Sequence, residues 1–135
     1  MKFNKIAVVM SLVFLALGCG LAEGPREKLD RGLFQFNEGL RWGRYSDVLP
    51  VVDADAREHF QKMHEEWGTT ILITAADVLQ VLYNDRERKA DISVRYSWYR
   101  KKEMTAYDTV TKQHWEYRVG KWWLVAEEFQ SGQPF

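Results

Sequence analysis

The stretch WEYRVGKWWLV, residues 115–125, contains two short aromatic segments separated by Val119-Gly120. A two-residue loop at this position is typical of a tight hairpin between antiparallel strands. One face of that hairpin is aromatic and the other is mostly polar, which is the condition that fixes a strand register. The expected pairs are Tyr117 with Trp122, Trp115 with Leu124, Glu116 with Trp123, His114 with Val125, and Lys112 with Glu127.

Two further strands are predicted upstream, because apolar residues recur there at every second position. Residues 84–88 and 100–105 are polar and predict the turns that separate the strands. Together with the hairpin, this pattern predicts a four-stranded antiparallel meander. The residues that share the buried parity are Ile71, Ile73, Ala75, Leu79, Val81 and Tyr83 in the first strand, and Ile92, Val94, Tyr96 and Trp98 in the second.

Before residue 68 the apolar spacing is helical instead. Steps of four, three and four residues predict a first helix that stops near Gly43 and a second one that ends at Gly68. Asp55 and Glu58 resemble a capping box, and 46–52 is expected to be a turn or a short helix. The chain is therefore predicted to be α+β, with N-terminal helices packed on one face of the sheet. The helix stripes are Leu29, Leu33, Phe36 and Leu40, then Ala56, Phe60, Met63 and Trp67.

Composition limits the class of protein. The chain has 135 residues, is 46% hydrophobic, and carries 19 basic and 19 acidic side chains. That length suits one domain, and the hydrophobicity excludes a disordered chain. A single cysteine excludes an internal disulfide, and the zero formal charge disfavours nucleic acid as a partner.

The N-terminus is predicted to be a targeting segment. Lys2 and Lys5 precede an apolar run at 6–17 that is too short for a permanent membrane span. The run ends at LALGC, residues 15–19, which resembles the lipobox of bacterial lipoproteins. The resemblance implies cleavage after residue 18, lipid on Cys19, and a bacterial envelope location; Gly20 favours the outer membrane, facing the periplasm. The alternative is an ordinary secretory signal cut near Ala22.

These segments predict a signal peptide at 1–18, a tether at 19–28 and one domain at 29–135. Over residues 29–128, the order of helices and strands together with the aromatic hairpin resembles the nuclear transport factor 2-like superfamily. That resemblance implies a curved sheet which forms a cone with the helices. The superfamily includes isomerases, dehydratases and non-catalytic binding domains, so the fold alone does not define a function.

Asp77 is the candidate for acid-base chemistry. In a continuous first strand it shares the parity of the aromatic face, opposite Tyr96 or Trp98 and near Arg100. Apolar surroundings would raise the pKa of its carboxyl group, whereas Arg100 would lower it. The alternative is that Asp77 ends or caps a helix-to-strand turn, with a bulge that restores the parity. Residues expected to line a pocket in the cone are Trp98, Arg100, Trp115 and Trp122.

The histidines predict no metal site. His59 and His64 are five residues apart and cannot bind one metal from a single helix face, so both are expected to be solvated or partly packed. His114 is expected to be structural, and no cofactor is expected. The basic run at 100–102 is expected to be a solvated turn.

Two classes of function follow. The first is a non-catalytic lipoprotein domain that binds a small apolar ligand or an envelope protein, or forms a homodimer through the outer sheet face around Trp123 and Val125. The second is a small hydrolase, isomerase or dehydratase that uses Asp77 with Tyr96. A cone filled by its tryptophans favours the first class, and an open cone with an ionisable group favours the second.

Overall fold

The computed structural model describes residues 20–135, so the expected signal peptide and Cys19 lie outside the described residues. The chain is α+β, as predicted. Within the described part, no helix combines the length and the apolar character that crossing a membrane requires. The elements are α1 (Pro25–Arg41), α2 (Tyr45–Val48), η2 (Leu49–Val51), η3 (Ala54–Ala56), α3 (Arg57–Met63), β1 (Ile71–Asn84), β2 (Lys89–Arg100), β3 (Ala106–Arg118) and β4 (Lys121–Gly132).

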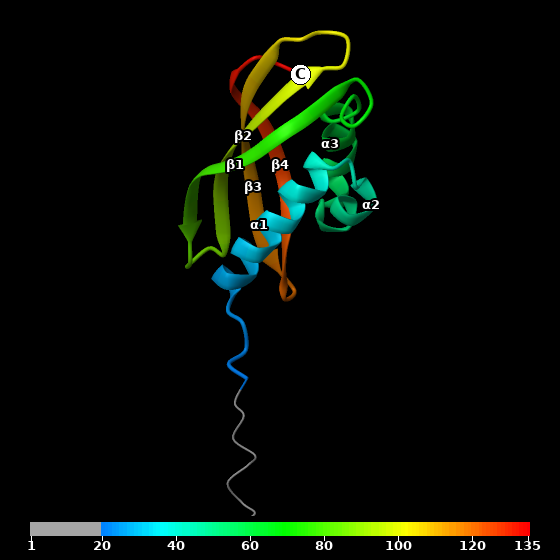
Figure 1. Cartoon of the computed structure of the whole chain (residues 1–135). Helices are drawn as coiled ribbons and strands as arrows, with labels where there is room; N and C mark the ends of the chain where they lie inside the picture. Colours follow the sequence, from blue (N-terminus) through cyan, green and yellow to red (C-terminus); the bar gives the residue numbers. More distant parts are fainter. Residues whose placement is uncertain (1–19) are drawn as a thin grey trace, which may run out of the picture.

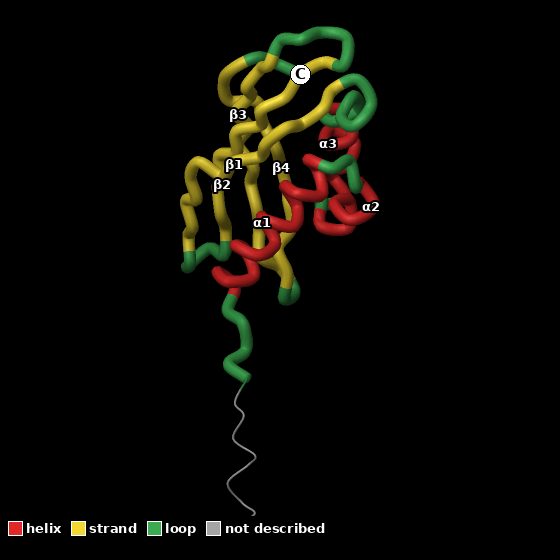
Figure 2. The backbone as a smooth tube through the Cα atoms, in the orientation of Figure 1, coloured by secondary structure: helices red, strands yellow, loops and turns green. Residues whose placement is uncertain are grey.

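The four strands form one curved antiparallel sheet in the order β1-β2-β3-β4, which confirms the predicted meander (Figure 1). The helices gather on one side of this sheet, and α1 runs across it (Figure 2). The predicted stripe of α1 is buried against the strands, since its four members are at most 3% exposed. Burial of this stripe is what holds the helix, because isolated helices of this length are marginal in water.

The first helix begins earlier than expected. It starts at Pro25, so the last four residues of the predicted tether are helical. Proline suits the first helical position because its backbone has no N–H group to leave unpaired, and Gly24 precedes it with an extended backbone. The helix ends as predicted, since Gly43 has a φ of 66°.

The second predicted helix is shorter than its apolar spacing suggests. It ends at Met63, and Trp67 is buried from a turn that follows the helix. The capping box was wrong: the Asp53 side chain accepts a hydrogen bond from the Asp55 backbone N–H, which starts a 3₁₀ turn. The short helices η2 and α2 occupy the segment that was expected to be a turn or a short helix.

The β3–β4 hairpin has the predicted loop and the three predicted pairs nearest to it. Beyond them, a bulge at Val125 shifts the register by one residue, so the expected partners of His114 and Lys112 were wrong. These residues face Ala126 and Glu128 instead. A shift of one residue exchanges the two faces of a strand. The carboxyl group of Glu127 therefore lies inside the domain and is 3% exposed.

Bulges also change the faces of β1. Register shifts follow Ile73 and Val78, and between them the parity is opposite to the predicted one. Asp77 consequently pairs with Arg95 on the outer face, whereas Ala76 pairs with the buried Tyr96. After the second bulge the predicted parity returns, which places Val81 and Tyr83 on the inner face as expected.

Candidate functional site

The residues expected to line an open cone fill it instead. Trp98, Trp115 and Trp122 are 1%, 2% and 5% exposed and belong to the hydrophobic core. Arg100 lies at the surface, where its guanidinium contacts the Glu66 carboxylate at 2.6 Å. These four residues therefore do not form a common pocket.

Asp77 and Tyr96 are on opposite faces of the sheet, so the acid-base pair of the enzyme hypothesis was wrong. The Asp77 carboxylate lies 3.3 Å from the Arg95 guanidinium, and both side chains are about half exposed. The physical reason is the pair of β1 bulges. The alternative foresaw a bulge, but the turn that it placed at Asp77 was wrong, because this residue pairs with Arg95 within β1. The Tyr96 hydroxyl is buried and belongs to a different set of hydrogen bonds.

Tyr96 is part of a buried polar network in which each hydrogen bond has a forced direction. The Trp115 indole N–H can only donate, and it donates to Gln113 Oε1 at 3.1 Å. Gln113 Nε2 is thereby directed toward the Tyr96 hydroxyl oxygen, at 2.9 Å. The Tyr96 hydroxyl in turn donates to Asn37 Oδ1 at 3.0 Å. The network therefore fixes the amide of Asn37, with its oxygen facing inward.

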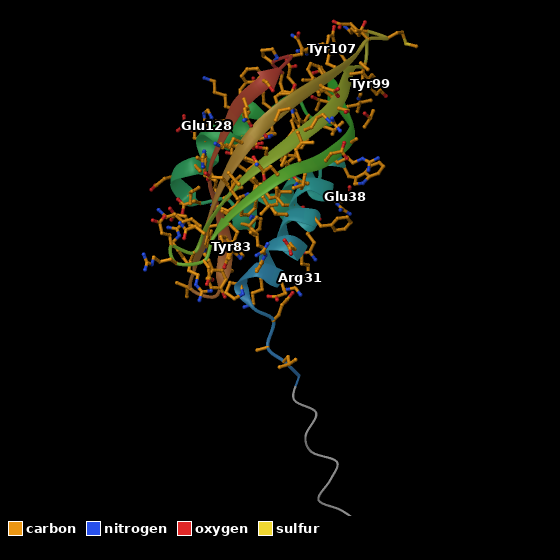
Figure 3. All side chains as sticks on the ribbon, turned by 90° about the vertical axis from the view of Figure 1, so that its left-hand side faces the viewer. Arg31, Glu38, Tyr83, Tyr99, Tyr107 and Glu128 are labelled. Carbon is orange, nitrogen blue, oxygen red and sulfur yellow. The ribbon has the colours of Figure 1, made fainter. Side chains whose placement is uncertain are left out.

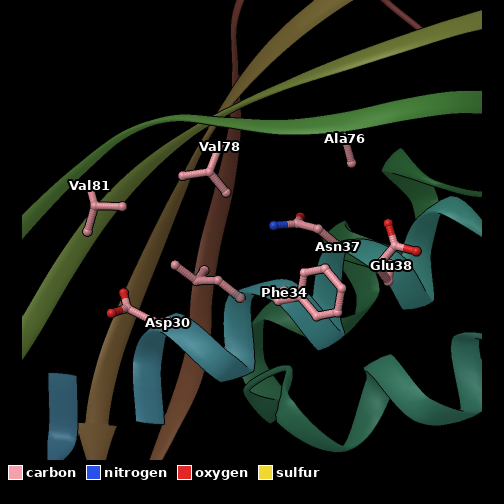
Figure 4. Close-up of a pocket in the computed structure, with 8 residues that line it drawn as sticks. Asp30, Phe34, Asn37, Glu38, Ala76, Val78 and Val81 are labelled. Carbon is pink, nitrogen blue, oxygen red and sulfur yellow. The ribbon is translucent and has the colours of Figure 1, made fainter. Parts of the chain in front are cut away.

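A groove between α1 and β1 lies next to this amide. Its volume is about 260 Å³, and Leu33, Phe34, Ala76, Val78 and Val81 give it apolar walls (Figure 4). The Phe34 side chain is 70% exposed, and Val78 and Val81 are 44% and 37% exposed. Apolar walls that are accessible to solvent in a concave site are characteristic of ligand-binding pockets.

The amide nitrogen of Asn37 points into this groove (Figure 4). It finds no hydrogen-bond partner among residues 20–135, although the residue is only 4% exposed. An unpaired buried donor costs roughly 1 to 3 kcal/mol. A ligand that supplies a carbonyl, ether or hydroxyl oxygen would recover part of this cost.

Two carboxylates stand at the rim of the groove. Asp30 and Glu38 both line it, and Figure 4 shows them at its edges. Glu38 accepts a hydrogen bond from the Trp42 indole at 3.0 Å and lies 3.5 Å from the Arg41 guanidinium. Negative charge at the rim disfavours an anionic ligand and is compatible with a neutral or cationic one.

A second buried polar pair joins α3 to β4. His64 Nε2 and Glu127 Oε2 are 3.2 Å apart, and both side chains are at most 1% exposed. His64 Nδ1 lies 2.7 Å from the Phe60 carbonyl oxygen, so this nitrogen must donate. The other ring nitrogen, Nε2, faces the buried Glu127 carboxyl group.

The surroundings of this pair indicate a structural role. Glu127 Oε1 accepts a hydrogen bond from the Thr111 hydroxyl at 2.8 Å. The His64 ring packs between Phe60 and Trp67, with ring centroids at 4.3 Å from each. The pair is closed to solvent and does not line the groove.

Sequence reasoning missed most of this polar interior. His64 was expected to be solvated or partly packed but is 1% exposed, while His59 is exposed as expected. The sequence of β3 did indicate buried polar groups, because Thr109, Thr111 and Gln113 alternate in step with Trp115 and so share its inward face. The sequence had no corresponding signal for Glu127, because the bulge at Val125 decides its face. His114 lies on the outer face, as its predicted position on the polar face implied, and its Nδ1 atom is 2.6 Å from Asp91 Oδ1.

The buried hydroxyl group of Tyr96 predicts that the free energy of unfolding falls at alkaline pH. Burial, followed by the nearby Glu127 carboxyl group, raises the pKa of Tyr96 well above its usual value of 10.0. The folded state then keeps a proton that the unfolded state releases, so stability is intact below pH 10 and falls as the pH rises further. For one such tyrosine the slope approaches about 1.4 kcal/mol per pH unit.

The measurement is urea unfolding of wild type and Tyr96→Phe from about pH 8 to pH 11. The variant has no hydroxyl to ionise, so its stability should fall less steeply above pH 10, by up to about 1.4 kcal/mol per pH unit. Its lost hydrogen bonds lower stability equally at all these pH values. Parallel curves for the two proteins would contradict the burial of this hydroxyl group.

Within residues 20–135, no group of three or more His, Asp or Glu side chains is arranged to hold a metal ion. Neither a protein-family model nor a curated protein sequence matches the chain. A function is therefore proposed from the chemistry of the groove and from the filled interior beneath it.

Proposed function

We propose that the protein is a lipid-anchored bacterial envelope protein whose domain binds a small, largely apolar ligand in the groove between α1 and β1. The observation that carries this proposal is the fixed Asn37 amide, which presents a donor inside an apolar groove. The interior filled by tryptophans favours binding over catalysis. The resemblance to a lipobox at residues 15–19 supports the anchor, and Gly20 favours the outer membrane, facing the periplasm.

We infer that the fold is of the nuclear transport factor 2-like type. In support, helices at the N-terminal end pack on one side of a curved, four-stranded antiparallel sheet. The groove lies in the space between the first helix and this sheet. Here Asn37 from α1 and Val78 from β1 meet in that space.

The groove defines the chemistry of the ligand. Its apolar walls favour a hydrocarbon or aromatic body, and the Asn37 amide favours one oxygen acceptor on that body. The carboxylates of Asp30 and Glu38 disfavour an anionic group at the rim. A neutral or cationic molecule with a single carbonyl, ether or hydroxyl oxygen meets all three conditions.

The neutral fluorescent ketone 6-propionyl-2-dimethylaminonaphthalene tests this proposal. It should bind with an increase and a blue shift of its emission, because the groove excludes water from its ring. Val81→Ser should weaken binding about tenfold, since it removes apolar wall area. The matched control is Leu82→Ser, which changes an exposed neighbour on the opposite face of the same strand.

A second comparison isolates the amide. The analogue 6-propyl-2-dimethylaminonaphthalene, in which a methylene group replaces the ketone carbonyl, should bind about tenfold more weakly, which corresponds to one hydrogen bond. Equal effects of the two serine substitutions would overturn the proposed groove. Equal affinity for the two probes would overturn the proposed role of Asn37.

The anchor is tested separately in cells. Bacteria that express the chain and are fed labelled palmitate should yield a labelled protein, and Cys19→Ala should abolish the label. A diacylglyceryl cysteine supplies the two acyl chains that stable anchoring requires. An unlabelled mature protein that begins near residue 23 would instead support the ordinary secretory signal.

A further inference from the structure

The end of the domain that is joined to residues 20–24 carries a surface that the groove does not use. The start of α1, the turn at 85–88 and the tip of the β3–β4 hairpin all lie at this end (Figure 1). Figure 3 shows the same division, with Arg31 and Tyr83 toward this end and Tyr99 and Tyr107 at the other. We name it the proximal surface and define it by Lys28, Arg31, Val119, Lys121 and Trp122.

Two hydrogen bonds hold the proximal surface together. The Trp122 indole donates to the Pro25 carbonyl oxygen at 2.7 Å, and the Lys28 ammonium donates to the Gly120 carbonyl oxygen at 3.2 Å. The start of α1 is therefore fixed against the hairpin tip. The hairpin tip therefore has a fixed orientation relative to residue 25, where the segment 20–24 joins the domain.

A hollow of about 360 Å³ lies in the proximal surface. Lys28, Arg31 and Lys121 line it together with Trp115 and Trp122. The Lys28 ammonium contacts the Gly120 carbonyl oxygen and the Tyr117 hydroxyl, and the Lys121 ammonium contacts the Pro50 carbonyl oxygen and the face of the Trp123 ring. All of these partners are neutral. The positive charges of the two ammonium groups are therefore still available to an anion, whereas Arg31 lies 2.6 Å from the exposed Glu23.

Val119 projects from the tip beside this hollow. It is fully exposed and has a φ of 51°, in the left-handed region that valine rarely adopts. Asparagine or glycine suits this position of a two-residue hairpin loop. Val119 is thus an exposed apolar residue at a loop position whose backbone conformation favours asparagine or glycine. Backbone outliers of this kind cluster at functional positions.

The distance from the expected anchor selects the partner. Five residues, 20–24, separate Cys19 from the start of α1 at Pro25. Fully extended, they span at most about 18 Å. A lipid on Cys19 therefore keeps the proximal surface close to the membrane.

We propose that the proximal surface docks on anionic phospholipid headgroups. Lys28 and Lys121 contact phosphate groups, and Val119 enters the interface between headgroups and acyl chains. Basic side chains beside an apolar tip are the combination that binds such an interface. This inference rests on the proposed lipid anchor and adds a fixed orientation of the domain on the membrane.

The experiment uses the full lipidated protein, reconstituted in vesicles of phosphatidylcholine with or without phosphatidylglycerol. Val119→Cys is labelled with the polarity-sensitive fluorophore nitrobenzoxadiazole. The natural sequence contains one cysteine, and its thiol carries the lipid, so the introduced thiol is the one available for labelling. The matched control is Met104→Cys, at another fully exposed apolar position, in the turn at the opposite end.

The probe at position 119 should shift to the blue and gain at least twofold in intensity in vesicles that contain phosphatidylglycerol. The probe at position 104 should not respond. Lys28→Glu and Lys121→Glu should each reduce the ratio of docked to undocked protein by about fivefold or more, and salt should reduce it as well.

Equal responses at positions 104 and 119, or none at either, would overturn the docking. A response at 119 that is the same without phosphatidylglycerol would overturn the role of the basic hollow. Mass measurement and vesicle flotation of the same sample report whether the lipid is present. Failure of the anchor is thereby distinguished from failure of the docking.

Discussion

Replacing His64 by leucine is expected to lower the free energy of unfolding by about 3 to 5 kcal/mol, because it leaves the buried Glu127 carboxyl group without its partner. The two groups are 3.2 Å apart in a region closed to solvent. The same substitution removes the donor to the Phe60 carbonyl oxygen. Urea unfolding of the domain at neutral pH measures the loss.

Glu127→Gln is the matched variant, because an amide keeps the acceptor for the Thr111 hydroxyl and offers a donor to His64 Nε2. Its loss should be clearly smaller than that of Glu127→Leu. In a double-mutant cycle, His64→Leu with Glu127→Leu should cost less than the sum of the single changes. Additive losses would show that the two side chains do not interact.

Trp122→Ala is expected to cost about 3 to 5 kcal/mol, as the truncation of a large core side chain. Its ring is 5% exposed and packs against Tyr83 and Tyr117, and its indole N–H donates to the Pro25 carbonyl oxygen. The substitution therefore removes core volume and one contact between α1 and the hairpin.

The neighbouring Trp123→Ala should cost about 1 kcal/mol or less. Trp123 pairs with Glu116 on the outer face, and the Lys121 ammonium lies 3.8 Å from its ring centroid. An exposed cation–π contact contributes roughly 0.5 to 1 kcal/mol. Equal losses for the two tryptophans in urea unfolding would contradict the register of the hairpin.

The hairpin shows what could be predicted from residue order. Aromatic and polar residues alternate on both sides of Val119-Gly120, so a single register buries Trp115 and Trp122 together. The stripe of α1 is as clear, because four apolar residues at helical spacing can face only one way. Local periodicity was sufficient for these elements because their buried face follows directly from residue spacing.

The candidate site could not be predicted in the same way. The inward position of Glu127 depends on the bulge at Val125, and the outward position of Asp77 depends on two bulges in β1. A bulge places two residues opposite one and exchanges the faces of the residues that follow, up to the next bulge. Local spacing contains no marker for these insertions.

The sequence by itself determined the α+β class, the four-stranded meander, the two main helical segments and the inward tryptophans, since each follows from the period of apolar residues. Only the tertiary structure decided that Asp77 is a surface residue, that His64 meets Glu127, and that the Asn37 amide faces a groove. These features join residues far apart in the chain. Their placement depends on bulges and on packing between elements, which local periodicity does not specify.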